Sequence, residues 1–234
     1  MNLDALRGGL IVSVQAWPNS AIDDPYVIAA MARAAQESGA VAVRVQGVAN
    51  LRAARARVEL PVIGLIKREY PGFDPYVTPT LDEVEAVLAA GAEIVAFDAT
   101  ARPRPAKTGV ATIVESVHAA GRIAMADCAT FEDALRAWAA GADAVATTLC
   151  GYTPETAAET LPALNLVARL RRACDDGAGG LVVCEGGVHH PSQLRAALDA
   201  GADAVVVGTA ITNVDWLVRQ FAGSANAEPL RERD

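Results

Sequence analysis

A lysine ends an apolar segment in which a charged amine would be costly. Residues 61–67 read Pro-Val-Ile-Gly-Leu-Ile-Lys, and a short Val- and Ile-rich run of this kind predicts a strand that is buried on both faces. Removing an ammonium group from water is unfavourable unless the group is paired or neutral. Lys67 is therefore a candidate for proton transfer. The alternative is a structural ion pair with an acid such as Asp98.

Glu185 ends a second apolar segment, Leu181–Glu185, and supplies a matching acid. If the two segments lie on opposite sides of one cavity, the amine and the carboxyl group address opposite faces of a bound carbon atom. Removal of a proton from one face and its return to the other face inverts a stereocentre. Lys67 accepts a proton only when it is neutral, so we expect its apolar strand and the nearby Arg44 to lower its pKa.

Two glycine motifs in the C-terminal part of the chain are typical of phosphate binding. Gly186 and Gly187 follow one apolar segment, and Gly208 and Thr209 follow another. Glycine lets backbone N–H groups approach an anion closely. Because phosphate sites of (β/α)8 barrels lie at the ends of strands 7 and 8, the two motifs together predict phosphate-binding loops.

Eight short Val- and Ile-rich segments alternate with alanine-rich segments of helical period. The expected strands are Gly9–Gln15, Val41–Gln46, Val62–Lys67, Glu93–Asp98, Ile123–Asp127, Ala144–Leu149, Leu181–Glu185 and Ala204–Val207. The expected helices include Pro25–Glu37, Leu81–Ala89, Phe131–Ala139 and Pro191–Asp199. This alternation predicts an α/β fold, a single (β/α)8 TIM barrel over residues 1–222, with a polar C-terminal tail over 223–234.

The carboxyl ends of the strands of such a barrel meet at one rim. The residues expected there are Gln15, Arg44, Lys67, Asp98, Asp127, Thr147, Thr148, Glu185, Gly208 and Thr209. Strand ends often reach solvent, which would explain polar residues at one or two of these positions, but not a polar group at every strand end. A recurring turn, Ala-Gly-Ala-Asp-Ala-Val at 140–145 and again at 200–205, is expected to end helices with a left-handed glycine. Thr80 and Thr130 are expected to be helix N-caps.

Two proline-containing loops, 68–80 and 98–105, follow strand ends and are expected to cover a ligand. The first loop carries Tyr70, Phe73 and Tyr76.

The composition excludes several classes of function. The chain has 234 residues, a net charge of −8 and a pI near 4.9, which argues against binding to nucleic acid or to membrane surfaces. No apolar run approaches the roughly 18 residues that would span a bilayer. The four cysteines and three histidines show no metal-ligand spacing, so we expect no metal, and reduced core thiols in a cytoplasmic protein. His189 and His190 are expected to be loop or capping residues.

Several motifs together resemble one enzyme family. They are PVIGLIKREYPGFDPYVTPT, FDATARPRP, MADCAT, TTLCGYT, and CEGG with VVVGTAIT, in this order over about residues 9–221. The chain resembles the N-acetylmannosamine-6-phosphate 2-epimerases, also called N-acylglucosamine-6-phosphate 2-epimerases. The resemblance implies a barrel that converts N-acetylmannosamine 6-phosphate to N-acetylglucosamine 6-phosphate in sialic-acid catabolism, without a metal or an organic cofactor.

The resemblance also implies roles for individual residues. The catalytic lysine and glutamate of the family fall on Lys67 and Glu185, and its sugar-binding residues fall on Gln15, Arg44 and Asp127. Expected beside them are Thr148 for substrate binding, and Gly186, Gly187, Gly208 and Thr209 for phosphate binding.

The chain departs from the family pattern at three positions. Asn213 stands where the family usually has a phosphate-binding arginine, Ala101 where lysine is common, and Cys150 where serine is common. The sequence therefore leaves open whether the sugar carries a phosphate, and the backbone amides of Gly187 and Gly208 are the groups expected to hold one.

Two other functions fit the same residues. Lys67 of a lyase would form a Schiff base with a keto-acid phosphate, and a non-catalytic barrel would only bind a sugar phosphate. A small-molecule sugar phosphate is the expected partner. The acidic surface and the alanine-rich helices permit a homodimer, and the sequence does not indicate the direction of the reaction in the cell.

Overall fold

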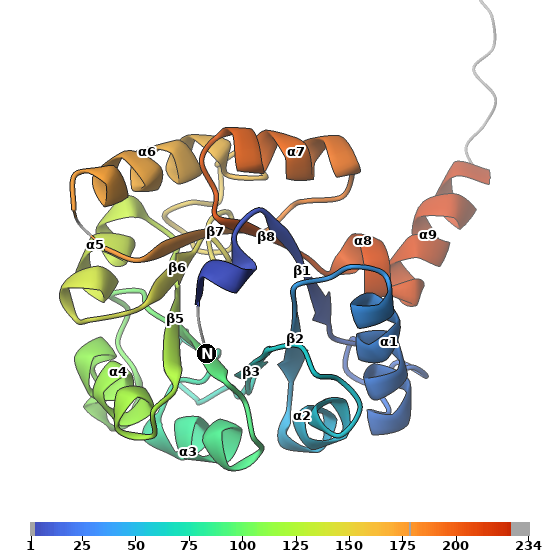
Figure 1. Ribbon diagram of the computed structural model, residues 1–234, viewed down its shortest axis with the longest axis horizontal. Coiled ribbons are helices and arrows are strands. Elements are labelled where there is room, and N and C mark those ends of the chain that lie inside the picture. The colour runs from blue at the N-terminus through green and yellow to red at the C-terminus, as the bar shows by residue number, and fades with distance from the viewer. Residues whose placement is uncertain (1–2, 178, 226–234) are drawn as a thin grey trace, which may run out of the picture.

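The computed structural model describes residues 3–177 and 179–225, and it contains a closed barrel of eight parallel strands (Figure 1). The strands are β1 (Gly9–Val14), β2 (Ala42–Gln46), β3 (Val62–Leu65), β4 (Ile94–Asp98), β5 (Ile123–Asp127), β6 (Ala144–Ala146), β7 (Leu181–Glu185) and β8 (Ala204–Val207). Each strand pairs with the next along the chain, and β8 pairs with β1. The predicted (β/α)8 TIM barrel is confirmed. Since β3 and β7 are separated by three strands in either direction, they lie on opposite sides of the barrel.

Helices surround the barrel on the outside (Figure 1). They are α1 (Pro25–Glu37), α2 (Val48–Arg55), α3 (Leu81–Ala89), α4 (Val110–Ala119), α5 (Phe131–Ala139), α6 (Leu164–Asp175), α7 (Pro191–Asp199), α8 (Thr209–Thr212) and α9 (Val214–Ala225), with the 3-10 helix η2 (Pro105–Lys107). The N-terminal 3-10 helix η1 (Leu3–Leu6) instead lies over one end of the barrel (Figure 1). The predicted boundary after residue 222 falls within α9, because this helix continues to Ala225. The rest of the predicted tail, residues 226–234, lies outside the described residues. Among the described residues, no helix is both long and apolar enough to cross a bilayer.

The predicted helix signals act as expected. At the start of α5, the Thr130 hydroxyl accepts from the Asp133 N–H at 3.1 Å, and the Thr130 N–H donates to the Asp133 carboxylate at 3.0 Å. Thr80 and Glu83 form the corresponding pair at the start of α3. The glycine of the repeated turn adopts a left-handed backbone conformation, with φ of 94° at Gly141. A residue with a side chain would be strained there, which is why glycine occupies this position.

Three strands end earlier than the sequence predicts. β1 ends at Val14, β3 at Leu65 and β6 at Ala146. Lys67 therefore lies two residues beyond β3, where it forms an isolated antiparallel bridge with Val77. The chain leaves the barrel ladder at this point because the loop that follows folds back and pairs with it.

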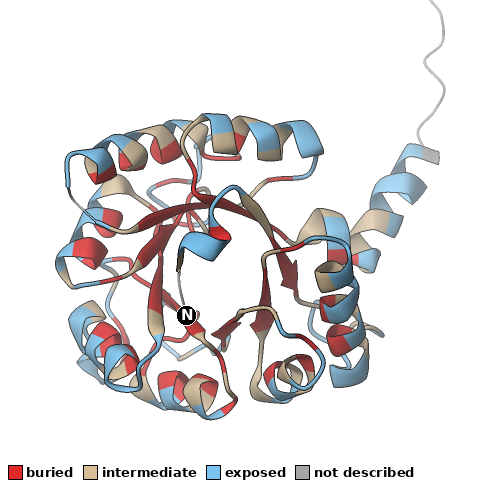
Figure 2. Cartoon of the chain, in the orientation of Figure 1, coloured by how far each residue is buried: buried red, intermediate tan, exposed pale blue. Residues whose placement is uncertain are grey.

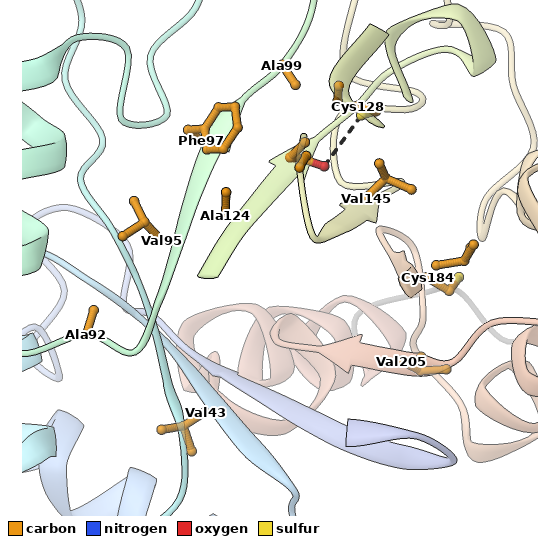
Figure 3. Close-up of a cluster of buried hydrophobic side chains, with 14 of the residues drawn as sticks. Val43, Ala92, Val95, Phe97, Ala99, Ala124, Cys128, Val145, Cys184 and Val205 are labelled. Atoms are coloured by element: carbon orange, nitrogen blue, oxygen red, sulfur yellow. Dashed lines mark hydrogen bonds between the residues drawn. The ribbon is translucent and has the colours of Figure 1, made fainter. Parts of the chain in front are cut away.

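The apolar residues form two layers on either side of the barrel wall. One cluster fills the barrel interior and includes Ile11, Ile63 and Met125. The other lies between the strands and the helices, and its members around Phe97 are drawn in Figure 3. Figure 2 shows the same division, with buried residues on the strands and on the inward faces of the helices.

All four cysteines are buried and free, as expected for core thiols. Burial raises the pKa of the Cys184 thiol to about 11. These side chains are therefore protonated at neutral pH and serve as small apolar residues.

Candidate active site

A cavity of about 250 Å³ opens at the carboxyl ends of the strands. Its wall contains Ser13, Gln15, Ala16, Trp17, Arg44, Lys67, Tyr76, Val77, Thr148, Leu149, Tyr152, Glu185, Gly186, Gly187, Val188, His189, Val206, Gly208, Thr209 and Asn213. Nine of the ten residues predicted to form the site belong to this wall; Asp127 is the tenth. The structure thus brings together residues from β1, β2 and from the segments that follow β3, β6, β7 and β8.

A buried arginine organises the acidic side of the cavity. Arg44, on β2, is 2% exposed and makes two hydrogen bonds to Asp127, of 3.0 Å and 2.6 Å. The same guanidinium donates to the Glu185 carboxylate at 2.7 Å. A planar guanidinium matches two carboxylate oxygens at once, which fixes the orientation of both acids.

Asp127 lies beneath the cavity and does not line it. Its side chain is fully buried, and besides Arg44 it accepts a hydrogen bond of 2.6 Å from the Thr148 hydroxyl. The Thr148 oxygen also lies 3.2 Å from Glu185 Oε2. The geometry thus places Asp127 behind Arg44 and Thr148, and its predicted role in sugar binding stays a prediction.

The two candidate proton-transfer groups have shifted pKa values. Burial raises the pKa of Glu185 to about 7, although the Arg44 charge opposes this change. Lys67 lines the cavity and is exposed to solvent as a whole residue, while protein atoms partly enclose its amine. This enclosure lowers the pKa of Lys67, and the positive charge of Arg44 lowers it further, as the sequence predicts. The two shifts bring the pKa values of the amine and the carboxyl group closer together than those of the free side chains.

Lys67 forms no ion pair or hydrogen bond through its amine with any residue in the part of the chain that the structure describes. The alternative partner, Asp98, is fully buried and is bound by Arg102 at 2.8 Å and by Arg104 at 3.3 Å. The rim ion pair between Lys67 and Asp98 is therefore absent. Within loop 98–105, Arg102 and Arg104 donate hydrogen bonds to Asp98 and so stabilise the loop, and neither arginine lines the cavity.

The loop after β3 is a folded hairpin that positions Lys67. The Arg68 N–H donates to the Tyr76 carbonyl at 2.8 Å, and the Thr78 N–H donates to the Ile66 carbonyl at 2.7 Å. Of the three aromatic residues expected to cover a ligand, only Tyr76 lines the cavity. Tyr70 instead donates its hydroxyl to Glu83 at 2.8 Å.

The two glycine motifs lie side by side at one end of the cavity. Gly186 and Gly187 have φ of 103° and 70°, in the left-handed region that favours glycine. A Cβ atom on Gly187 would collide with Leu161, and one on Gly208 would lie 3.0 Å from the Cβ of Ser13. Glycine is therefore required for the backbone to line this part of the wall.

Asn213 begins helix α9. Its Oδ1 accepts the Trp216 N–H at 2.8 Å, and the side chain is almost fully buried while it lines the cavity. An asparagine directly before a helical segment is a typical N-cap signal, so the sequence could have predicted this capping role. The family resemblance pointed only to the missing phosphate-binding arginine at this position. Sequence reasoning also missed Ser13, which accepts a hydrogen bond of 2.8 Å from the Gln15 amide, and the wall residues Trp17 and Tyr152.

Comparison with known proteins places the chain in a family. Residues 28–227 match the family model NanE, described as "Putative N-acetylmannosamine-6-phosphate epimerase". The chain belongs to the NanE family. The chain is thus a carbohydrate epimerase of this family.

Relatives of this NanE chain cover nearly its whole length. A protein of Klebsiella pneumoniae subsp. pneumoniae is 46% identical over 211 residues, which is 90% of this chain and 87% of the relative. A protein of Escherichia coli O157:H7 is 45% identical over 218 residues, 93% of this chain and 91% of the relative. Both are named "Putative N-acetylmannosamine-6-phosphate 2-epimerase".

A solved structure, the N-acetylmannosamine-6-phosphate 2-epimerase from Clostridium perfringens, is similar to this NanE chain with a TM-score of 0.89 and 38% identity. The match covers 94% of this chain and 95% of the clostridial one. Thiamine phosphate pyrophosphorylase from Pyrococcus furiosus, at 18% identity and a TM-score of 0.60, shares the fold alone.

Proposed function

We propose that this enzyme interconverts N-acetylmannosamine 6-phosphate and N-acetylglucosamine 6-phosphate by proton transfer at C2. One observation carries the mechanism: an amine with a lowered pKa and a carboxyl group with a raised pKa line one cavity from opposite sides of a barrel. The names of the relatives support the substrate.

C2 of the ring-opened sugar is next to an aldehyde, so the anion formed there spreads onto oxygen. Neutral Lys67 takes the C2 proton from one face, and the electron pair of the broken C–H bond moves toward the aldehyde oxygen. Arg44 or the Gln15 amide stabilises the charge on that oxygen. Protonated Glu185 then gives its proton to the opposite face of C2, and the reverse reaction uses the same groups with their protons exchanged.

The phosphate lies, in this proposal, against the backbone amides of Gly186, Gly187, Gly208 and Thr209. Asn213 lines the same end, and its Nδ2 makes no hydrogen bond to a described residue, so this amide is free to donate to a phosphate oxygen. We place the reaction in the cytoplasm and in sialic-acid catabolism. Among the described residues, no group of three or more His, Cys, Asp or Glu side chains is arranged to hold a metal ion.

Solvent exchange tests the proposed function. In D2O, N-acetylmannosamine 6-phosphate is expected to become N-acetylglucosamine 6-phosphate with deuterium at C2, because each proton removed equilibrates with solvent through the Lys67 amine or the Glu185 carboxyl group. Proton NMR follows both the new epimer and the loss of the C2–H signal. If neither the epimer nor the exchange is seen, the proposal fails.

We also propose that the enzyme is a homodimer joined through α9. This helix extends away from the barrel (Figure 1), and Val214, Val218 and Phe221 on one of its faces are 49%, 60% and 75% exposed. Their spacing forms one apolar stripe, and a second copy of the chain presents the same stripe for self-association.

Light scattering after size exclusion is expected to give twice the monomer mass for the native chain. The monomer mass is expected for Val218→Glu, which places a charge in the stripe. Gln220→Ala is the matched control, because Gln220 is exposed on α9 outside the stripe. A monomeric native protein, or a dimeric Val218→Glu variant, would contradict this interface.

A further inference from the structure

The phosphate end of the cavity contains one side chain that can carry a positive charge. Gly186, Gly187 and Gly208 offer only backbone groups there, and Asn213 offers a neutral amide. Among the described residues of the wall, the side chain beside these loops that can carry a positive charge is that of His189, which follows the first glycine motif. We propose that the imidazole ring of His189 binds the phosphate group of the substrate and makes the site selective for phosphorylated sugars; this inference rests on the proposed function.

Three other cations lie in or near the cavity. Arg44 is bound to Asp127 and Glu185. Lys67 follows β3, across the barrel from the loop that follows β7. Arg219 places its guanidinium 4.7 Å from the ring centre of Trp17 and does not line the cavity. Arg44 is thus held by two carboxylates, Lys67 follows the opposite strand, and Arg219 lies outside the cavity wall.

His189 is held in position while its ring nitrogens stay free. Its backbone N–H donates to the Gln193 side chain at 2.8 Å, which ties the loop to the first turn of α7. Its ring lies against the ring of Trp216 on α9, with the centres 4.9 Å apart and the planes inclined by 33°. Neither ring nitrogen has a hydrogen-bond partner among residues 3–177 and 179–225. The ring is therefore oriented by stacking, and both of its nitrogens are available to a ligand.

The other two histidines differ in this respect. The His190 ring caps α7 and lies 2.8 Å from the Ser192 hydroxyl, and His190 does not line the cavity. His118, on α4, binds the Asp143 carboxylate at 2.8 Å. Among the three, only His189 combines a position in the wall with an unpartnered ring.

Charge explains why such a residue is needed. A sugar phosphate enters a protein of net charge −8, in a cavity that already contains Glu185 with Asp127 beneath it. Backbone amides contribute only partial charges, whereas an imidazole ring that contacts a phosphate can donate a hydrogen bond to it and carry a full charge. Hydrogen bonds between charged partners are about twice as strong as those between neutral ones.

The test compares two substrates and two variants. For His189→Ala, KM for N-acetylmannosamine 6-phosphate is expected to rise about tenfold with kcat nearly unchanged, since a charged hydrogen bond contributes at about this level. The kcat/KM for unphosphorylated N-acetylmannosamine is expected to stay the same, because no phosphate is bound. The matched control is His190→Asn, which keeps a capping side chain on α7 and is expected to leave both KM values unchanged.

A purely structural role for His189 gives a different pattern. Loss of the stacking on Trp216 alone would change the two substrates equally, and equal changes would overturn the inference. His189→Gln keeps an N–H donor without the aromatic ring, so partial recovery of KM for the phosphorylated sugar supports binding of phosphate.

Binding of inorganic phosphate separates this inference from the proposed function. Isothermal titration of the native chain and of His189→Ala with phosphate requires no turnover. An affinity about tenfold weaker in the variant supports the inference even if no epimerase activity is found. Equal affinities overturn it and leave the epimerase proposal standing.

Discussion

Lys67→Met is expected to lower kcat for epimerisation by about 10²–10⁴-fold, the range lost when a positioned acid–base group is removed. Methionine keeps the length of the side chain and has no group that accepts a proton. The fold is expected to survive, because the Lys67 amine has no ion-pair partner among the described residues that its removal would strand. The measurement is the rate of C2 epimerisation together with the thermal unfolding temperature.

Two outcomes would contradict this role. Full activity of Lys67→Met would exclude the amine as a base. Trapping of a Lys67 adduct by borohydride with a keto-acid phosphate would favour the Schiff-base lyase, because a lysine that only transfers protons leaves no covalent product. Lys67→Arg is an informative companion, since a guanidinium keeps the charge but does not lose its proton at accessible pH.

The fold could be predicted from the sequence because its signals are local. The alternation of Val/Ile segments with alanine-rich segments needs only neighbouring residues, and so do the Thr130 cap and the glycine of the repeated turn. The ends of β3 and β6 could not be placed, because strand length depends on where the partner strand stops pairing. Gly64 is the last β3 residue that pairs with β4, and the hairpin through Val77 then takes over the chain.

The candidate site could be predicted in part for the same reason. Barrel topology brings the strand ends to one rim, so Lys67, Glu185 and Arg44 had to meet once eight strands were recognised. How far a side chain lies from the cavity depends on the three-dimensional packing, so the sequence could not show that Asp127 lies below the cavity wall. The stacking of His189 on Trp216 joins the loop after β7 to the last helix, and no pattern of spacing indicates such a contact.

The arrangement around Arg44 explains why the pKa of Glu185 is raised although a guanidinium lies beside it. Asp127 takes two of the guanidinium hydrogen bonds and accepts a third from the Thr148 hydroxyl. Glu185 shares the same arginine through a single hydrogen bond and lies beside the Asp127 charge. The effect of burial on Glu185 therefore outweighs the stabilisation of its negative charge by Arg44, and the pKa of Glu185 is raised to about 7.

Glu185→Gln is expected to lower kcat by about 10²–10⁴-fold and to change the pH profile. Proton transfer in either direction needs the Lys67–Glu185 pair to hold one proton, so activity of the native enzyme is expected to rise with pH through about 7, as the doubly protonated pair loses a proton. It falls again at alkaline pH, when Lys67 loses its proton below the ordinary lysine value of 10.5. The limb near pH 7 is expected to vanish in Glu185→Gln, because glutamine does not titrate.

Deuterium exchange then distinguishes opposed proton transfer from a single base. In D2O, Glu185→Gln retains Lys67, which can remove the C2 proton of one epimer and return a deuteron to the same face without inversion. Lys67→Met retains Glu185, which can do the same only with the other epimer, because the two groups approach C2 from opposite sides of the barrel. The two variants are therefore expected to exchange different epimers. Exchange of the same epimer by both variants would mean that Lys67 and Glu185 act on one face, and inversion at C2 would then need another acid.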